Sequence, residues 1–426
     1  VLIPEIALTY QTVMRFYRRF GDRISIIHSR LSAGEKYDQF QRAENGDIDI
    51  MIGPRSALFT PFPRPGLVII DEEHESSYKS ETTPRYHARE TAIELARMEN
   101  AKVILGSATP SLEAYYRAKK GEYALYTLNR RARSSILPEV SVVDMREELK
   151  NGNRSIISEA LKEQIEKKLQ SEEQIMLFLN RRGYAGFLSC RSCGHVIKCP
   201  HCDVSLSVHN YGRMICHYCG YEEKRPEVCP KCGSTFISTF GIGTQQVEQV
   251  VRKIFSHARV LRMDMDTTRT KNGHEKILSA FQNQEADILI GTQMIVKGHD
   301  FPNVTLVGIL AADLSLYADD YKAGERTFQL LTQAAGRAGR GEKQGNVIIQ
   351  TYDPEHYCIQ ASAKQDYQAF YEEEMSYRML ADYPPAVFMI SIHGSGKDED
   401  HLQKAMEYLV KVTERMPEKK AVKIFG

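Results

Sequence analysis

Two acidic residues at the end of an apolar run are the first residues that could do chemistry. Asp71 and Glu72 follow directly on Leu67–Ile70, and His74 stands two positions later. The run has the length and β-branching of a buried strand, whose rigid end would present Asp71 to Mg²⁺ and Glu72 to an attacking water. Nucleoside triphosphate hydrolysis requires such an arrangement. Taken alone, the sequence Asp-Glu-Glu-His at 71–74 is equally compatible with a strand that leads into a solvated acidic turn.

A second apolar run, Val103–Leu105, leads into the sequence Gly-Ser-Ala-Thr-Pro. By itself this sequence predicts only a helix start, with Thr109 as the N-cap and Pro110 as the first helical residue. Combined with the acidic strand end at Asp71, it resembles the pairing of motifs II and III in superfamily 2 helicases. The two segments together indicate a helicase far more specifically than either segment does alone.

A glycine- and arginine-rich sequence, Gln333–Arg340, ends a helical pattern further along the chain. Arg337 and Arg340 are three residues apart and could share one helix face. Planar guanidinium groups suit the charge that spreads over a transferring phosphoryl group. We therefore expect Gln333, Arg337 and Arg340 to join Asp71, Glu72 and His74 in a catalytic site, rather than to form an ordinary basic helix end.

A polar loop follows another apolar run, Ile288–Ile290. Thr292 and Lys297 in this loop could contact a DNA phosphate, and Asp300 could bind a nucleotide ribose. Taken alone, the segment is an ordinary strand-to-loop transition.

The phosphate-binding loop of nucleotide hydrolases, Gly-x-x-x-x-Gly-Lys-[Ser/Thr], does not occur in the sequence; Gly394–Lys397 lacks the first glycine and the hydroxyl residue. The chain opens on an apolar segment, Val1–Pro4, without an initiator Met, and closes on a second such segment, Val422–Gly426. We therefore interpret the sequence as a fragment lacking both ends, with the phosphate loop upstream. We expect the fragment alone not to hydrolyse ATP.

Eight of the 9 cysteines form four Cys-x-x-Cys pairs in one short stretch. Clustered pairs in a long chain are typical of metal ligands in a reducing compartment, here the cytoplasm, rather than of disulfides. Their number fits two closed, structural Cys₄ zinc sites, and leaves Cys358 as a buried small residue. From the spacing we favour a nested arrangement in which the inner two pairs share one ion and the outer two the other. The ligands would be Cys190, Cys193, Cys229 and Cys232 for one ion, and Cys199, Cys202, Cys216 and Cys219 for the other.

Composition and hydrophobic patterning predict the elements that must position these residues. The 426 residues are 42% hydrophobic and 26% charged, with a net charge of +1, so a basic footprint for nucleic acid would have to be local, and no apolar run is long enough to span a bilayer. Short apolar runs alternate with helical patterns, which predicts an α/β fold with parallel sheets and helices on both faces. The expected helices are 84–98, 158–169, 274–282 and 324–334; further expected strands are 175–179, 305–310 and 347–349.

The same alternation predicts the domain organisation. The charged segment around residues 130–150 interrupts it, and the cysteine cluster interrupts a second alternating block. We expect a first lobe at 1–128, a linker at 129–155, a second lobe at 156–189 and 236–352, a two-zinc insertion at 190–235, and the start of a further domain at 353–426.

With these motifs in hand, the chain resembles the PriA family of bacterial replication-restart helicases along essentially its whole length. The resemblance rests on helicase motifs combined with a double zinc insertion in the second lobe. The matching segments are Val1–Thr9, Arg55–Phe59, Asp71–His74, Ser77–Lys79, Arg85–Arg89, Phe178–Gly183, the four cysteine pairs, Gly291–Met294 and Gln333–Arg340.

The resemblance implies two RecA-like P-loop NTPase lobes, ATP and Mg²⁺ as cofactors besides two zinc ions, and the nested zinc pairing. It further implies a cytoplasmic, nucleoid-associated 3′→5′ DNA helicase that recognises and remodels stalled forks and starts primosome assembly. Its partners would be forked and single-stranded DNA, primosome proteins and single-strand-binding protein, and no membrane. The alternatives are a zinc-dependent DNA- or protein-binding platform without catalysis, and an RNA helicase or double-strand translocase, which the zinc insertion disfavours.

The resemblance also implies that residues 75–89 form an aromatic-rich loop that senses single-stranded DNA. We expect the rings of Tyr78, Tyr86 and His87 to stack on bases, with the cations Arg55, Lys79 and Arg85 holding the DNA backbone. Two residues depart from the family pattern: Pro84 stands where some relatives have Trp, and Pro54 where Thr is usual before Arg55.

Overall fold

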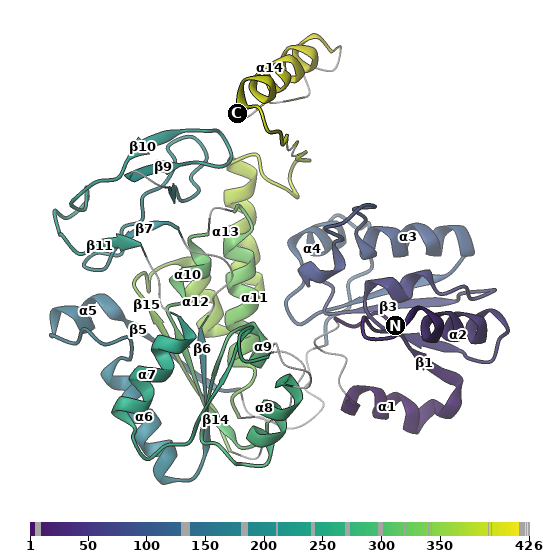
Figure 1. Ribbon diagram of the computed structural model, residues 1–426, viewed down its shortest axis with the longest axis horizontal. Coiled ribbons are helices and arrows are strands. Elements are labelled where there is room, and N and C mark those ends of the chain that lie inside the picture. The colour runs from purple at the N-terminus through teal and green to yellow at the C-terminus, as the bar shows by residue number, and fades with distance from the viewer. Residues whose placement is uncertain are drawn as a thin grey trace.

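The computed structural model describes residues 1–4, 10–128, 137–179, 186–209, 212–239, 243–268, 273–296, 301–318, 320–339, 341, 343–390, 392, 394–416, 422 and 424. Two α/β lobes lie opposite each other, the cysteine-rich module lies beside the second lobe, and the C-terminal helix stands apart (Figure 1). Among the described residues, no helix is both long enough and apolar enough to cross a membrane.

Lobe 1 is built on two pairs of parallel strands that the N-terminal segment joins. Strand β1 (Ile24–Ile26) pairs with β2 (Ile50–Ile52), and β3 (Leu67–Asp71) pairs with β4 (Lys102–Gly106). Leu2 lies between the two pairs: its N–H donates to the Ile69 carbonyl at 2.7 Å, and its carbonyl accepts from the Asp71 N–H at 2.9 Å. In the apolar segment that opens the chain, Leu2 is therefore a bridging residue, 1% exposed, between the two strand pairs.

Four helices accompany this sheet: α1 (Tyr10–Phe20), α2 (Ala33–Glu44), α3 (Ala88–Glu99) and α4 (Leu112–Lys119). The expected burial of both faces of the sheet is wrong in lobe 1, where Leu67 and Ile104 are 50% and 51% exposed. Among the described residues, no helix covers these two side chains fully. Helix α3 begins at Ala88, four residues after the expected start at Pro84, because His87 adopts an extended backbone and caps the helix.

Lobe 2 is a six-stranded, fully parallel sheet in the order β12-β13-β6-β14-β15-β5. Its central strands, β6 (Gln174–Leu179), β13 (Ile288–Gly291) and β14 (Val304–Leu310), are buried at every residue, as their continuous apolar runs predict. The flanking strands are β12 (Val260–Met263), β15 (Asn346–Thr351) and β5 (Glu139–Asp144), and the helices are α5 (Met145–Lys150), α6 (Glu159–Gln170), α7 (Thr244–Ile254), α8 (Gly273–Gln282), α9 (Gln293–Val296), α10 (Asp313–Leu316) and α11 (Ala323–Ala335).

Two of the expected lobe boundaries are wrong. The expected linker at 129–155 contains β5, which pairs with β15 along six residues at the edge of the lobe 2 sheet. An edge strand is half-exposed, which explains why its alternating and charged sequence looked like a connector. The expected further domain at 353 begins instead with α12 (Tyr357–Lys364) and α13 (Tyr367–Leu380), which pack into the core of lobe 2.

Among the described helices, only α14 (Glu399–Arg415) stands apart from both lobes, and none of its residues is buried. The cysteine-rich module is bounded by an antiparallel pair, β7 (Leu188–Cys190) and β11 (Ile237–Thr239), which brings the ends of the insertion together. Between them, β8 (Ser207–Val208), β9 (Arg213–Ile215) and β10 (Glu222–Lys224) form a small antiparallel sheet with a hydrophobic cluster of its own.

Candidate nucleotide site and zinc module

The acidic pair lies at the carboxyl end of β3, where the sequence places it. Asp71 accepts a hydrogen bond from the Glu72 N–H at 3.1 Å, and burial raises the pKa of its carboxyl. Glu72 adopts a left-handed backbone with φ of 48°, which is unfavourable for a residue with a side chain and is typical of functional sites. The N–H of the next residue, Glu73, donates to the Gly106 carbonyl at 3.0 Å and ties the ends of β3 and β4 together. The two strand ends therefore form one rigid edge.

His74 joins three motifs from two lobes. Its Nδ1 lies 2.7 Å from Ser107 Oγ, at the end of β4, and its Nε2 lies 2.9 Å from the amide nitrogen of Gln333, on α11 of lobe 2. The amide nitrogen of Gln333 can only donate, so His74 Nε2 accepts and the ring proton on Nδ1 is donated to Ser107. The His74 side chain is 3% exposed and lies 3.6 Å from the Glu72 carboxylate. The ring thus links the acidic strand end to the arginine-bearing segment of the other lobe.

The two arginines of that segment were expected to share a helix face, and the structure describes only the first of them. Helix α11 ends at Ala335, so Arg337 lies in the turn that follows. Arg337 is half-buried and lies three residues after Ala334, the expected end of the helix. Arg340, Lys297 and Asp300 lie outside the described residues. Thr292 lies between β13 and α9, and its carbonyl accepts from the Ile295 N–H at 3.0 Å.

The segment after β4 starts its helix later than Thr109. Ser111 is the N-cap of α4, and its hydroxyl accepts from the Ala114 N–H. Glu73, 3% exposed, accepts from both the N–H and the hydroxyl of Ser111, at 2.6 and 3.0 Å, and from Arg89 at 3.1 Å. Sequence reasoning missed these structural roles of Glu73, Arg89 and Ser111. The third acid of the Asp-Glu-Glu-His sequence was the signal that could have suggested them.

The expected DNA-stacking role of Tyr78 is wrong for this conformation. Tyr78 is 1% exposed, and its hydroxyl donates to the Asp71 carbonyl at 2.7 Å. Burial raises the pKa of the phenol, and the neighbouring acids raise it further. Tyr78 therefore anchors the segment 75–89 to the acidic strand end, where no base can reach its ring.

Other residues of this segment bind one another. Arg55 donates from one nitrogen to the carbonyls of Ser77 and Lys79, at 2.9 and 2.7 Å, and Lys79 donates to the Arg85 carbonyl at 2.7 Å. Tyr86 is half-buried and packs edge-on against Phe59. Of the six expected DNA contacts in lobe 1, Lys79 and Arg85 are exposed. Lys79 already donates to the Arg85 carbonyl and so closes the loop.

His87 caps α3 instead of offering its ring to a base. Its Nδ1 accepts from the Arg89 N–H at 3.2 Å. Burial, with a smaller contribution from the charge of Arg89, lowers the pKa of His87 to about 4. The ring is therefore neutral in the folded protein at neutral pH, as its role as acceptor requires.

This pKa predicts an acid-sensitive lobe 1. Below pH 6.5 the unfolded chain binds a proton at His87 that the folded chain excludes until about pH 4, so this contribution to stability is present above pH 6.5 and is lost as pH falls. The loss is about 2–3 kcal/mol over that range. His87→Ser keeps an N-cap acceptor without the titration. We expect the lobe 1 melting temperature of the wild type to fall more than that of the variant between pH 7.5 and 4.5; parallel decreases would contradict the assignment.

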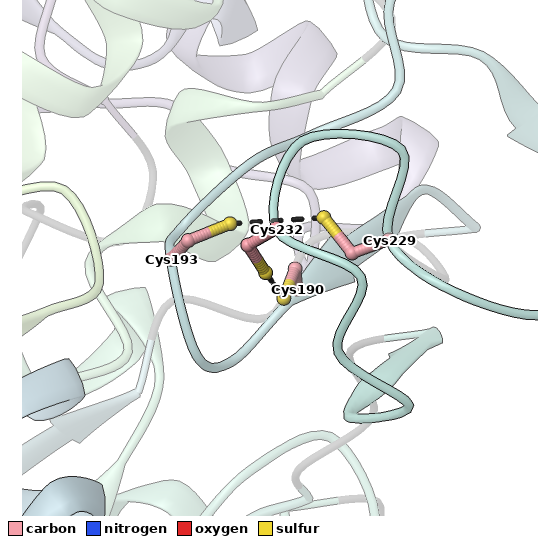
Figure 2. Close-up of side chains that lie close together, drawn as sticks. All are labelled: Cys190, Cys193, Cys229 and Cys232. Carbon is pink, nitrogen blue, oxygen red and sulfur yellow. Dashed lines mark hydrogen bonds between the residues drawn. The ribbon is translucent and has the colours of Figure 1, made fainter.

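The eight paired cysteines form two separate clusters, as the nested arrangement predicts. Within each cluster the sulfur atoms all lie within 4.8 Å of one another. Figure 2 shows the outer cluster, in which Cys190 lies 3.7 Å from Cys232 and Cys193 lies 3.7 Å from Cys229. A tetrahedral zinc ion with Zn–S bonds of about 2.3 Å separates its sulfurs by about 3.8 Å. The clusters fit two zinc ions, and Cys358, fully buried against the Gly324 carbonyl, belongs to neither.

Each Cys-x-x-Cys pair has the same backbone geometry. The N–H four residues after the first cysteine donates back to that cysteine's carbonyl, at 2.8–3.0 Å. The donor has positive φ in every case and is Gly194, Asp203, Gly220 or Gly233. Glycine adopts this conformation without strain, so the Cys-x-x-Cys-Gly sequence of three of the pairs was a signal for the turn that sequence reasoning did not use.

The basic residues around the module are partly neutralised by acids. Lys198 pairs with Asp203 at 3.1 Å, and Arg213 pairs with Glu222 at 3.2 Å. Each of these two cations is therefore already paired with a carboxylate.

We expect metal analysis of the purified chain to return about two zinc ions. Cys199→Ser removes one ligand of the inner site, so the zinc content should fall toward one and residues 199–219 should become accessible to protease. The lobe 2 melting temperature should change little, because the module has its own hydrophobic cluster. A zinc content of one or none in the wild type would contradict the two-site account.

The two α/β lobes, with the acidic end of β3 in lobe 1 facing helix α11 of lobe 2, define the class of two-lobed helicases. Residues 1–117 match the DEAD/DEAH box helicase family, residues 235–342 the helicase conserved C-terminal domain, and residues 199–224 the PriA DNA helicase Cys-rich region (CRR) domain. Among solved structures, Mss116p bound to ssRNA and AMP-PNP has a TM-score of 0.47 and 12% identity, covering 98% of this chain and 70% of that one. RecG bound to a three-way DNA junction has a TM-score of 0.44 and 14% identity, covering 95% and 42%.

The chain belongs to the PriA family. Replication restart protein PriA of Bacillus subtilis strain 168 is 55% identical over 91% of this chain and 48% of the relative. The Synechocystis protein of the same name is 46% identical over 100% of this chain and 52% of the relative. The chain thus spans about half the length of these curated relatives.

Proposed function

We propose that this chain is the motor region of an ATP-dependent 3′→5′ DNA helicase that recognises and remodels stalled replication forks and starts primosome assembly. The observation that carries the motor assignment is His74, which links the acids of lobe 1 to Gln333 of lobe 2. ATP hydrolysis at the acidic end of β3 would then change the contact with lobe 2 directly. The fork and primosome functions rest on family membership.

The residues would act in stated roles. Asp71 would hold Mg²⁺ and Glu72 would orient the attacking water, while Arg337 would stabilise the charge on the transferring phosphoryl group. Arg340 would share the catalytic role of Arg337, Asp300 would bind the nucleotide, and Thr292 and Lys297 would contact DNA, as expected from the sequence. Forked and single-stranded DNA, primosome proteins and single-strand-binding protein would be the partners, in the cytoplasm at the nucleoid.

The proposal can be tested by measuring the unwinding of forked DNA with a full-length protein, that is, one as long as the curated relatives. We expect ATP-dependent unwinding when the loading strand allows 3′→5′ movement, and none with the opposite polarity. Stimulation of ATP hydrolysis by RNA as strong as by forked DNA would favour the RNA helicase alternative. Binding of DNA without any ATP hydrolysis would favour the platform.

A further inference from the structure

The first turn of α4 is a contact between the lobes that the nucleotide site does not use. Its N-terminal amides have no partners within the helix and require acceptors from elsewhere. Glu73 of lobe 1 takes the Ser111 N–H, and Glu325 of α11 in lobe 2 takes the Leu112 N–H at 2.9 Å. One helix end therefore receives a carboxylate from each lobe.

Buried charges hold Glu325 in place. Its second oxygen accepts from Arg378 at 2.9 Å, and Arg378, fully buried, also donates to Glu374 at 2.9 Å. Gly324, next to Glu325, has no room for a side chain, because an added Cβ would lie 2.6 Å from the Glu374 carboxylate. Separating the lobes at this point would leave the buried Leu112 N–H without its acceptor, while Glu325 would keep its ion pair with Arg378 inside lobe 2.

Apolar and ionic contacts extend the same junction. Leu112, fully buried, belongs to the hydrophobic core of lobe 2. Tyr115 packs edge-on against Tyr371 at 4.7 Å, and its hydroxyl donates to Gln368 at 2.8 Å. Lys322 pairs with Glu113; although burial raises the pKa of Glu113, the charge of Lys322 brings it down to about 2.

The contact at His74 is much smaller. It joins the lobes through one neutral hydrogen bond with Gln333, in a part-buried position. Such a bond exchanges readily for bonds to water. Glu325 and Gln333 lie on the same helix, about 12 Å apart along its axis.

We propose that the first turn of α4 is a permanent anchor between the lobes, with Glu325 as its positioning residue. Lobe movement then breaks and re-forms the His74–Gln333 contact, while α4 stays docked on α11 and α13. The cycle of movement rests on the proposed function, whereas the anchor itself does not.

Amide hydrogen exchange tests the anchor. In the full-length protein, we expect exchange in residues 111–115 to stay equally slow without nucleotide and with a non-hydrolysable ATP analogue plus single-stranded DNA. Exchange in residues 72–77 should change severalfold between the two states. Exchange in 111–115 that changes as much as in 72–77 would overturn the proposal.

Variants of the 426-residue chain test the anchor independently of ATP hydrolysis. Glu325→Ala should speed exchange in residues 111–115 on the order of tenfold or more, with α6 as an unaffected reference. Because Glu325→Ala also removes one of the two carboxylate partners of buried Arg378 and could damage folding, a second variant is needed. Lys322→Met removes the partly exposed ion pair with Glu113 and should also speed exchange in residues 111–115. Lys322→Arg keeps the charge and should restore wild-type exchange. Unchanged exchange in both Glu325→Ala and Lys322→Met would overturn the anchor. Absence of ATP hydrolysis in the full-length wild type would instead count against the proposed function alone.

Discussion

Glu72→Gln is expected to lower ATP turnover by about 10²–10⁴-fold in the protein at the full length of its relatives. The substitution keeps the size of the side chain and the left-handed backbone position, but removes the carboxylate that would orient water. Asp71 remains for Mg²⁺, so nucleotide binding should persist. Steady-state hydrolysis and nucleotide binding, measured on the same preparation, separate the two effects.

Glu81→Gln is the matched control, since Glu81 is exposed in the same loop. It should hydrolyse ATP at the wild-type rate. Near-normal hydrolysis by Glu72→Gln would show that another residue activates the water.

Arg337→Ala is expected to lower ATP turnover by about 10³–10⁵-fold, by analogy with other arginines that stabilise phosphoryl transfer. The half-buried position of Arg337 just after α11 would keep its charge little screened by solvent. The effect should appear in kcat more than in the affinity for ATP, because the interaction strengthens in the transition state.

Arg337→Lys keeps the charge but loses the planar pair of donors, and should recover only part of the activity. Arg326→Ala, on the exposed face of α11, should retain the wild-type rate. An equal loss in Arg337→Ala and Arg326→Ala would point to damage to α11 rather than to a catalytic role.

Buried apolar runs made the lobe 2 sheet predictable from sequence. Strands such as β13 and β14 match the expected runs within a residue, because continuous burial leaves a continuous signal. Helix α6 was equally predictable, since Ser158 supplies its N-cap. β5 could not be recognised because an edge strand tolerates charged residues. Helices α12 and α13 could not be assigned to lobe 2, because the local sequence of a helix does not show which domain it packs against.

The candidate site was predictable where one short sequence carries the chemistry. The acids at Asp71 and the cysteine clusters follow from residue type and spacing alone. The role of Tyr78 does not follow from the sequence, because the same local sequence can place a tyrosine ring under its loop or at the surface. The contact between Glu325 and α4 joins residues more than two hundred positions apart, so only the fold reveals it.

A double-mutant cycle of His74→Ala and Gln333→Ala tests whether the hydrogen bond between these side chains couples the two lobes. The quantity to measure is single-stranded-DNA-stimulated ATP hydrolysis by the full-length protein. If the two side chains act through their shared hydrogen bond, either substitution should remove most of the stimulation and the double variant should be little worse than either single one. Effects that simply multiply in the double variant would contradict the link.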